Sequence, residues 1–311
     1  MNDQQATGIG IDLGGTKIEA VVASHDKILD RVRIATPKKS YQATVDAIVG
    51  LVDGLCDQPV PVGIGTPGVY RADEQKMVNC NSTWLNGMPL LPDLQSRLGN
   101  RVTLANDANC FVLSEATGGA AKNWKSAFGV ILGTGVGGGV AIDQHLLTGV
   151  NGIAGEWGHT PLPYFQQDTL LDRALAELEA RLVPRTCYCG RINCIEMFLA
   201  GPALASLHTQ LWGEVETPQE LGKQATDKAV KTLALYFHML SRSLAQLVNV
   251  IDPVGIVFGG GLSQLPNLVS QVAKIMPRYV FSERVLTQLA VAEHGDSSGV
   301  LGALRLAQQK G

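Results

Sequence analysis

Two glycine hairpins constrain the fold of this chain more than any other feature. Residues 7–23 alternate apolar and small residues on both sides of Gly14-Gly15, a pattern that predicts a strand, a tight turn and a second strand. The same arrangement returns at residues 128–142, where Gly133-Thr134-Gly135 interrupts another strand-like stretch. Two similar halves, each opening with such a hairpin, predict a duplicated α/β architecture with a domain boundary near Gly118-Gly119.

The remaining elements follow from hydrophobic periodicity. Apolar residues recur at helical spacing after Ser40, and a longer periodic stretch ends at Asp252-Pro253. The sequence therefore predicts helices over about 40–55, about 228–250 and from Val300 onward, and strands over 60–64, 102–105 and 254–258.

Composition and charge exclude several classes of protein. The 311 residues are 45% hydrophobic and 17% charged, with a formal net charge of -3, and no Lys/Arg tract offers an electrostatic footprint for nucleic acid. The N-terminal residues do not resemble a signal peptide, and no apolar run approaches the roughly 20 residues that span a bilayer. We expect a cytoplasmic protein without nucleic-acid or membrane partners, in which a disulfide framework is disfavoured.

The glycine turns do not fit the two commonest nucleotide motifs. Residues 133–138 satisfy G-x-G-x-x-G, but a dinucleotide fingerprint needs a following helix, whereas Val140-Ala141-Ile142 is strand-like. The first turn approaches a Walker A motif, but Lys17 follows Thr16 where that motif requires the reverse order. The dinucleotide interpretation remains the weaker alternative.

Phosphate binding explains the pair of hairpins better. Glycines let successive backbone N–H groups approach an anion, and Thr16 and Thr134 each add a hydroxyl donor. Asp12, just before the first turn, suits Mg²⁺, directly or through water. Either hairpin alone could be a simple tight turn, but the two together favour phosphate binding.

Half of the six cysteines lie within eight residues. Cys187, Cys189 and Cys194 follow the spacing C-x-C-x4-C and offer three thiolate ligands of the kind that zinc prefers. A redox pair formed by Cys187 and Cys189, or an accidental cluster, are the alternatives.

These motifs, in this order, resemble the ROK family of sugar kinases and related regulators. The resemblance rests on residues 12–17, Asn106-Asp107, Gly133–Gly135, Glu156-x-x-His159 and the cysteine stretch that runs to Glu196. Within the family the chain is most similar to the fructokinase/mannokinase branch, through residues 81–87 and 294–299, and then to the N-acetylglucosamine kinases.

The resemblance implies a duplicated actin/hexokinase-like (ribonuclease H-like) α/β fold with two domains around a central cleft. We expect one domain over residues 1–118 and a second over residues 119–311 that carries the zinc-binding loop. The last helix, about 300–311, is expected to pack back on the first domain.

The resemblance also implies the roles of individual residues. Asp107 would be the general base, although a helix N-cap is its structural alternative. The sugar would be held by Asn106, Asp107, Glu156, His159 and Glu196. His159 would complete the zinc site with one ring nitrogen and turn the other toward the sugar. The residues expected to bind ATP are Asp12, Gly14, Gly15, Thr16, Lys17, Gly133, Thr134 and Gly135 around the phosphates, and Gly259, Gly260 and Gly261 beside the adenosine.

The predicted function is an ATP-dependent hexose kinase that transfers the γ-phosphoryl group to the 6-hydroxyl of fructose and mannose, with Mg²⁺ and a structural Zn²⁺. The alternative is an N-acetylglucosamine or N-acetylmannosamine kinase, or a glucokinase, of the same family. A homodimer is expected from the resemblance.

Two other classes of protein are weighed against the kinase. A regulator of the family would need a helix-turn-helix domain before the first strand, where only about seven residues are expected. An inactive sugar-binding protein would be expected to lose the base or a phosphate-binding turn, whereas Asp12 and Asp107 are both present. One departure from the family pattern is Asn193, where glycine is common; asparagine tolerates the left-handed backbone that this turn needs.

Overall fold

The computed structural model describes residues 5–309, so the ends of the predicted N-terminal segment and last helix lie outside the described residues. The chain forms two compact units. Unit 1 contains residues 5–123, 139–154 and 293–309, and unit 2 contains residues 124–138 and 155–292. The predicted boundary after residue 118 stays a prediction.

The first sheet has five strands in the order β3-β2-β1-β4-β7, and β5 and β6 form a separate hairpin. β1 pairs antiparallel with β2 and parallel with β4, which is parallel to β7. The strands are β1 (Gly8–Leu13), β2 (Lys17–Ser24), β3 (Lys27–Ala35), β4 (Val62–Thr66), β5 (Val69–Arg71), β6 (Lys76–Val78) and β7 (Val102–Asn106).

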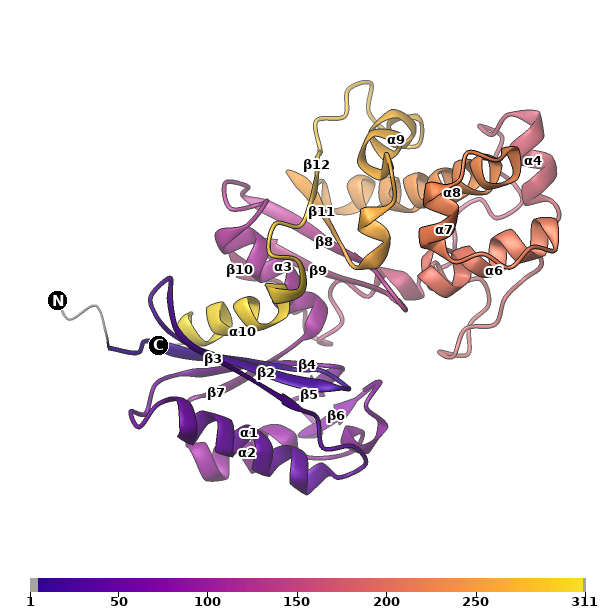
Figure 1. Cartoon of the computed structure of the whole chain (residues 1–311). Helices are drawn as coiled ribbons and strands as arrows, with labels where there is room; N and C mark the ends of the chain where they lie inside the picture. The colour runs from indigo at the N-terminus through magenta and orange to yellow at the C-terminus, as the bar shows by residue number, and fades with distance from the viewer. Residues whose placement is uncertain (1–4, 310–311) are drawn as a thin grey trace. The chain divides into compact units, whose positions relative to one another are not determined.

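Helices cover both faces of this sheet (Figure 1), with α10 on one face and α1 and α2 on the other. The helices of unit 1 are α1 (Tyr41–Leu55), α2 (Leu90–Leu98), α3 (Asp107–Gly118) and α10 (Ser298–Gln308), with the short η1 (Thr83–Leu85) and η5 (Gly295–Ser297). α10 approaches the sheet closely because Gly63 has no side chain: a Cβ there would lie 1.9 Å from the carbonyl oxygen of Ala303.

The second sheet repeats the order of the first, as β10-β9-β8-β11-β12. The central strand β8 is parallel to β11, which is parallel to β12, and β9 pairs antiparallel with β10. The strands are β8 (Ser126–Leu132), β9 (Val136–Ile142), β10 (His145–Leu146), β11 (Gly255–Gly259) and β12 (Gln288–Val291). The equal order confirms the predicted duplication and the actin/hexokinase-like α/β class.

Unit 2 is rich in helices. They are α4 (Arg173–Glu179), α5 (Glu196–Leu199), α6 (Gly201–Trp212), α7 (Pro218–Lys223), α8 (Asp227–Ile251), α9 (Leu268–Ile275), η2 (Trp157–His159), η3 (Gly261–Gln264) and η4 (Met276–Arg278). α8 begins after the N-cap Thr226 and ends at Asp252, whose left-handed backbone (φ 48°) stops the helix before Pro253. Between residues 5 and 309, no helix is both long enough and apolar enough to cross a membrane.

Candidate active site

The first glycine hairpin joins β1 to β2 and presents Asp12 at the end of a buried strand. The Gly14 N–H donates to the Lys17 carbonyl oxygen at 3.0 Å, which closes the turn, and Gly15 and Thr16 are exposed at its tip. Asp12 itself is half-buried, and burial followed by the neighbouring charge of Asp107 raises its pKa to about 6. A cation bound here would relieve the repulsion between two adjacent carboxylates.

The strand-to-helix junction after β7 positions Asn106 and Asp107. The Asn106 side chain accepts a hydrogen bond from the Asn109 N–H at 2.8 Å, so Asn106 is the N-cap of α3 and Asp107 is its first residue. Asp107 Oδ1 accepts from the Ala108 N–H at 2.8 Å, which leaves its other oxygen available.

Protein atoms crowd around the Asp107 carboxyl, and this burial raises its pKa. The residue keeps exposed surface, so this desolvation of the carboxyl is only partial. A raised pKa suits a group that must accept a proton.

Lys17 is held at the first hairpin by a buried carboxylate. Glu19 is only 1% exposed and lies 3.7 Å from Lys17 Nζ, 3.3 Å from Arg31 Nη1 and 2.6 Å from Arg33 Nη2. Three cations around one carboxylate leave a net positive charge beside the glycine turn, as a phosphate site requires.

The second glycine hairpin joins β8 to β9 and is tied to Glu196. The Gly133 N–H donates to the Gly135 carbonyl oxygen at 3.0 Å, and Thr134 is exposed at the tip. Glu196 Oε2 accepts from the Val136 N–H at 2.9 Å. It lies 2.6 Å from the position that a Cβ on Gly135 would take, so a side chain there would displace the carboxylate. Glu196, predicted to bind sugar, thus also braces the hairpin.

Glu156 directly precedes the short turn η2, and His159 ends it. Trp157 anchors this turn, because its ring is buried and its indole N–H donates to the Gly137 carbonyl oxygen at 2.9 Å. Trp157 therefore positions this turn. It lies within the Glu156-x-x-His159 motif, but the motif does not specify the residue at that place.

The predicted zinc ligands come together. The ligand atoms of His159, Cys187, Cys189 and Cys194 all lie within 4.8 Å of one another. Cys187 Sγ is 3.6 Å from His159 Nδ1, and the sulfur atoms of Cys189 and Cys194 are 3.5 Å apart. Such spacings fit four ligands at about 2.0–2.3 Å from one tetrahedral Zn²⁺.

The loop around the cluster contains one expected and one unexpected feature. Asn193 has φ 59°, so it takes the left-handed backbone anticipated from the sequence. Tyr188 was not anticipated: its hydroxyl lies 2.9 Å from His159 Nε2, the nitrogen expected to face the sugar, and its ring packs edge-on against the imidazole. The side chain is 76% exposed.

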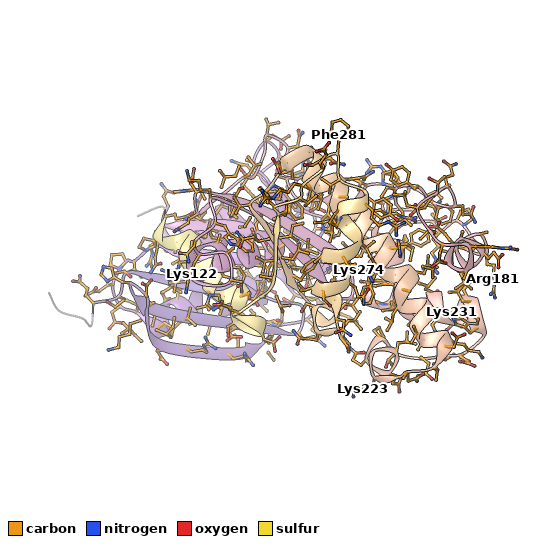
Figure 2. The ribbon with its side chains drawn as sticks, turned by 90° about the horizontal axis from the view of Figure 1, so that it is seen from above. Lys122, Arg181, Lys223, Lys231, Lys274 and Phe281 are labelled. Atoms are coloured by element: carbon orange, nitrogen blue, oxygen red, sulfur yellow. The ribbon has the colours of Figure 1, made fainter. Side chains whose placement is uncertain are left out.

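A pocket of about 250 Å³ lies in unit 2 between α7 and η3. Of the three predicted adenosine-side glycines, Gly261 lines it, together with Leu262, Leu265 and Pro266. Lys223 also lines it, and Figure 2 shows this side chain at the surface of unit 2. An apolar slot with one cation in its lining suits a nucleoside with attached phosphates.

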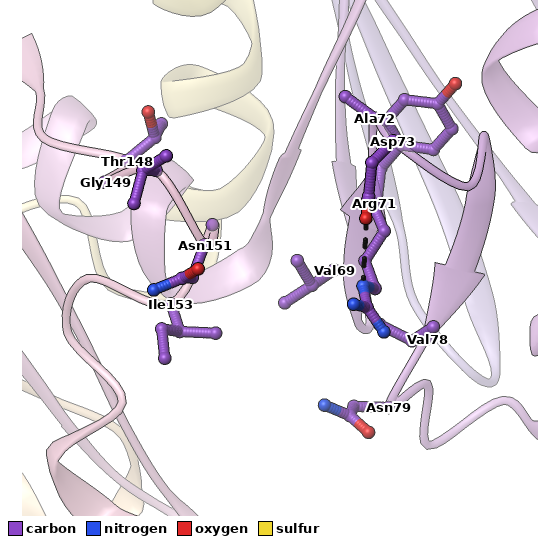
Figure 3. A pocket seen from close by; sticks show the side chains of 13 residues that line it. Val69, Arg71, Ala72, Asp73, Val78, Asn79, Thr148, Gly149, Asn151 and Ile153 are labelled. Carbon is purple, nitrogen blue, oxygen red and sulfur yellow. Dashed lines mark ion pairs between the residues drawn. The ribbon is translucent and has the colours of Figure 1, made fainter.

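A larger groove of about 820 Å³ lies within unit 1. One wall is the β5–β6 hairpin, with Val69, Arg71 and Asn79, and the other is the loop 148–153, with Asn151. Figure 3 shows these two walls facing each other across the groove. Val69 directly follows Gly68, whose carbonyl accepts from the Thr66 hydroxyl at 2.8 Å, so the groove begins at the loop after β4.

Each unit gathers its own share of the predicted site. Unit 1 brings together Asp12, Asn106 and Asp107, and unit 2 brings together Glu156, His159 and Glu196 with the cysteines.

Comparison with known proteins defines the class first: the chain is an ATP-dependent sugar kinase with the actin/hexokinase-like two-domain fold. A family model described as the ROK family matches residues 8–310, so the chain belongs to that family and the resemblance is confirmed.

Several relatives are similar over nearly the whole chain. The N-acetyl-D-glucosamine kinase of Photobacterium profundum is 37% identical over 303 residues, covering 94% of this chain and 97% of that protein. The enzyme of the same name from Escherichia coli O6:H1 is 35% identical over 301 residues, with the same coverage of both chains.

Two solved structures share the fold. A ROK hexokinase from Thermus thermophilus has a TM-score of 0.81 and 28% identity, covering 97% of this chain and 99% of that one. A ROK family glucokinase from Streptomyces griseus, in complex with glucose and AMPPNP, has a TM-score of 0.71 and 29% identity, covering 98% and 100%.

Proposed function

We propose that this chain transfers the γ-phosphoryl group of ATP to the 6-hydroxyl of N-acetylglucosamine. The observation that carries the proposal is the 37% identity with an N-acetyl-D-glucosamine kinase across 94% of the chain. The prediction of fructose and mannose as substrates lacks comparable support. We therefore replace it with its alternative, an N-acetylglucosamine kinase.

The fructose assignment rested on two segments whose residues make contacts that stabilise the fold of unit 1. In residues 81–87, the Trp84 ring packs on the core of unit 1 and its indole N–H lies 3.3 Å from Thr44 Oγ1. In residues 294–299, the His294 N–H and the Ser298 hydroxyl both face a buried carboxylate of α3. Contacts of this kind stabilise the fold whichever hexose is bound, so these segments are weak markers of the sugar.

In the proposed reaction Asp107 accepts the proton of the 6-hydroxyl as its oxygen attacks the γ-phosphorus and ADP leaves. Asn106 uses its side-chain oxygen to cap α3, which leaves its amide N–H₂ group to donate to a sugar hydroxyl. Glu156, His159 and Glu196 would bind the remaining hydroxyls. A site of this kind rejects sugars that lack a matching hydroxyl.

The glycine hairpins and Lys17 would hold the phosphates through backbone N–H groups and one cation. Asp12 would hold Mg²⁺, which supplies neutralisation of phosphate charge when bound. The three cysteines and His159 would hold Zn²⁺ in a closed, structural site, which supplies rigidity and no activated water.

The groove in unit 1 supplies room for an acetamido group. Its volume of about 820 Å³ far exceeds the space that such a group needs, and the amide side chains of Asn79 and Asn151 can pair with an acetamido N–H or C=O. β5, one wall of the groove, contacts β7, the strand that ends at Asn106. We place the acetamido group at this end of the groove.

Steady-state kinetics with ATP across a hexose panel tests the assignment. We expect the highest kcat/KM for N-acetylglucosamine, with glucose next, since a relative crystallised with glucose shares 29% identity. A kcat/KM for fructose or mannose above that for N-acetylglucosamine would overturn the proposal. Sedimentation should show a homodimer, as the family resemblance implies.

A further inference from the structure

One buried carboxylate has no part in the reaction proposed above. Glu115 lies on α3, eight residues after Asp107, and is 0% exposed. Two backbone N–H groups donate to its Oε2, from Ala120 at 2.9 Å and Glu293 at 3.0 Å. The His294 N–H donates to Oε1 at 3.1 Å.

The Ser298 hydroxyl lies 3.2 Å from the same Oε1, although it also faces the Gly295 carbonyl at 2.9 Å. Three backbone donors on two oxygens call for a group that only accepts, as an ionised carboxylate does. None of these donors is a cationic side chain, so backbone N–H groups and the Ser298 hydroxyl stabilise the buried charge.

The donors belong to two segments far apart in the sequence. Ala120 follows the end of α3, three residues before the chain first passes into unit 2, and Glu293 and His294 are the first residues after its last return to unit 1. Glu115 therefore fixes, inside unit 1, both the exit of the chain and its re-entry just ahead of α10.

α10 in turn lies directly against Asp12. A Cβ on Gly299 would lie 2.9 Å from the carboxyl carbon of Asp12, so the backbone of α10 touches that side chain. A Cβ on Gly302 would lie 1.8 Å from the Cys110 carbonyl oxygen, so the same helix also touches the backbone of α3. α10 is thus held between the strand that carries Asp12 and the helix that begins at Asp107.

We propose that Glu115 is a positioning residue, which joins the start of α10 to α3 and thereby sets the spacing of Asp12 and Asp107. The proposal rests on the proposed function, because it takes Asp107 as the base and Asp12 as the group that holds Mg²⁺. Glu115 acts through these two carboxylates and touches neither substrate.

The test is Glu115→Gln, measured as the separate changes in kcat and in KM for N-acetylglucosamine. Glutamine keeps the size but turns an amide N–H₂ toward a backbone N–H, which loses at least one hydrogen bond. We expect kcat to fall about 10- to 100-fold, as misplacement of reacting groups produces, with a smaller change in KM.

Measured per folded protein, the loss should stay in kcat and not in KM, because Glu115 touches neither substrate. Glu115→Asp, which keeps an acceptor on a shorter arm, should recover part of the rate.

Glu179→Gln is the matched control. Glu179 is 2% exposed in unit 2 and pairs with the buried Arg242, so its loss should lower stability without lowering kcat per folded protein. If Glu115→Gln keeps the wild-type kcat, or if Glu179→Gln lowers kcat equally, Glu115 is only structural and the proposal fails.

A second variant covers the case in which Glu115→Gln does not fold. A Cβ on Gly119 would lie 2.1 Å from Glu115 Oε2, so Gly119→Ala displaces the carboxylate without removing its charge. The same loss of kcat is expected, and a wild-type kcat would overturn the proposal. A wild-type protein inert toward every hexose would instead refute the proposed function itself.

Discussion

The two units hold their shares of the proposed site in different ways. In unit 1, Asp12 is paired within the sheet, opposite Glu19 and Gly65, and Asp107 opens a capped helix. In unit 2, Glu156 directly precedes a three-residue turn that ends at His159, and Glu196 begins a four-residue helix two residues after Cys194, the last member of the Cys/His cluster. Backbone hydrogen bonds organise the carboxylates of unit 1 that we propose to be catalytic, whereas a Cys/His cluster lies beside the groups of unit 2 that we propose to bind sugar. Only the second set should therefore depend on a metal.

The largest effect is expected in unit 1. Asp107→Asn keeps the shape of the side chain but cannot accept a proton, so kcat should fall by roughly 10² to 10⁴. Sugar affinity, measured by calorimetry without ATP, should change far less.

Asp53→Asn is the control for this variant. Asp53 is exposed on α1, and its substitution removes the same charge from the same unit. A variant at Asp107 that retains more than half of the wild-type kcat, with chemistry rate-limiting, would show that another group is the base.

Unit 2 should respond to loss of its metal. Purified protein should contain close to one zinc per chain. Cys189→Ser should abolish zinc binding and lower the free energy of unfolding by roughly 3–5 kcal/mol. Hydrogen exchange should accelerate in residues 156–160 and 185–196 and stay unchanged in α3.

Cys56→Ser makes the same chemical change in unit 1 and should keep the zinc. Full activity and unchanged exchange in a metal-free Cys189→Ser protein would remove the distinction between the two units.

Much of this contrast could be predicted from the sequence, because its motifs are local. The glycine turns, the helix N-terminus at Asn106 and the C-x-C-x4-C ligands each depend on a few adjacent residues. The left-handed backbone of Asn193 was likewise anticipated, since it follows from residue type and turn position.

What escaped prediction involves contacts between residues distant in sequence. Tyr188 meets His159 across 29 positions, and Glu115 meets His294 across 179. Neither partner stands in a periodic pattern that points to the other. The sequence likewise does not show that the Trp84 indole N–H faces Thr44, 40 positions away. Without that contact, the segment around Trp84 suggests a marker of the sugar.

A smaller effect tests whether holding the Asp12 carboxylate in place lowers the stability of unit 1. The pKa of Asp12, about 6, lies above that of an unfolded aspartate, so the folded state gains stability below about pH 4 and loses it as the pH rises toward 6. Without Mg²⁺, Asp12→Asn should raise the free energy of unfolding at pH 7 by about 1–2 kcal/mol and change little at pH 4. Urea titrations at both pH values would refute this if the variant were less stable at pH 7.

The smallest effect concerns Tyr188 in unit 2. Tyr188→Phe removes one exposed hydrogen bond to His159, worth about 0.5–1 kcal/mol, so KM for the sugar should change about 2- to 5-fold with zinc content and kcat unchanged. A loss of kcat above 10-fold would mean that the hydroxyl takes part in the chemistry.

The most direct test of the account is the identity of the product. Protein incubated with ATP and N-acetylglucosamine should yield one ADP per sugar, and NMR should place the phosphate on the 6-oxygen. The 6-deoxy sugar, which lacks only the acceptor hydroxyl, should give no product. Phosphate on the anomeric oxygen, or phosphorylation of the 6-deoxy sugar, would contradict the account.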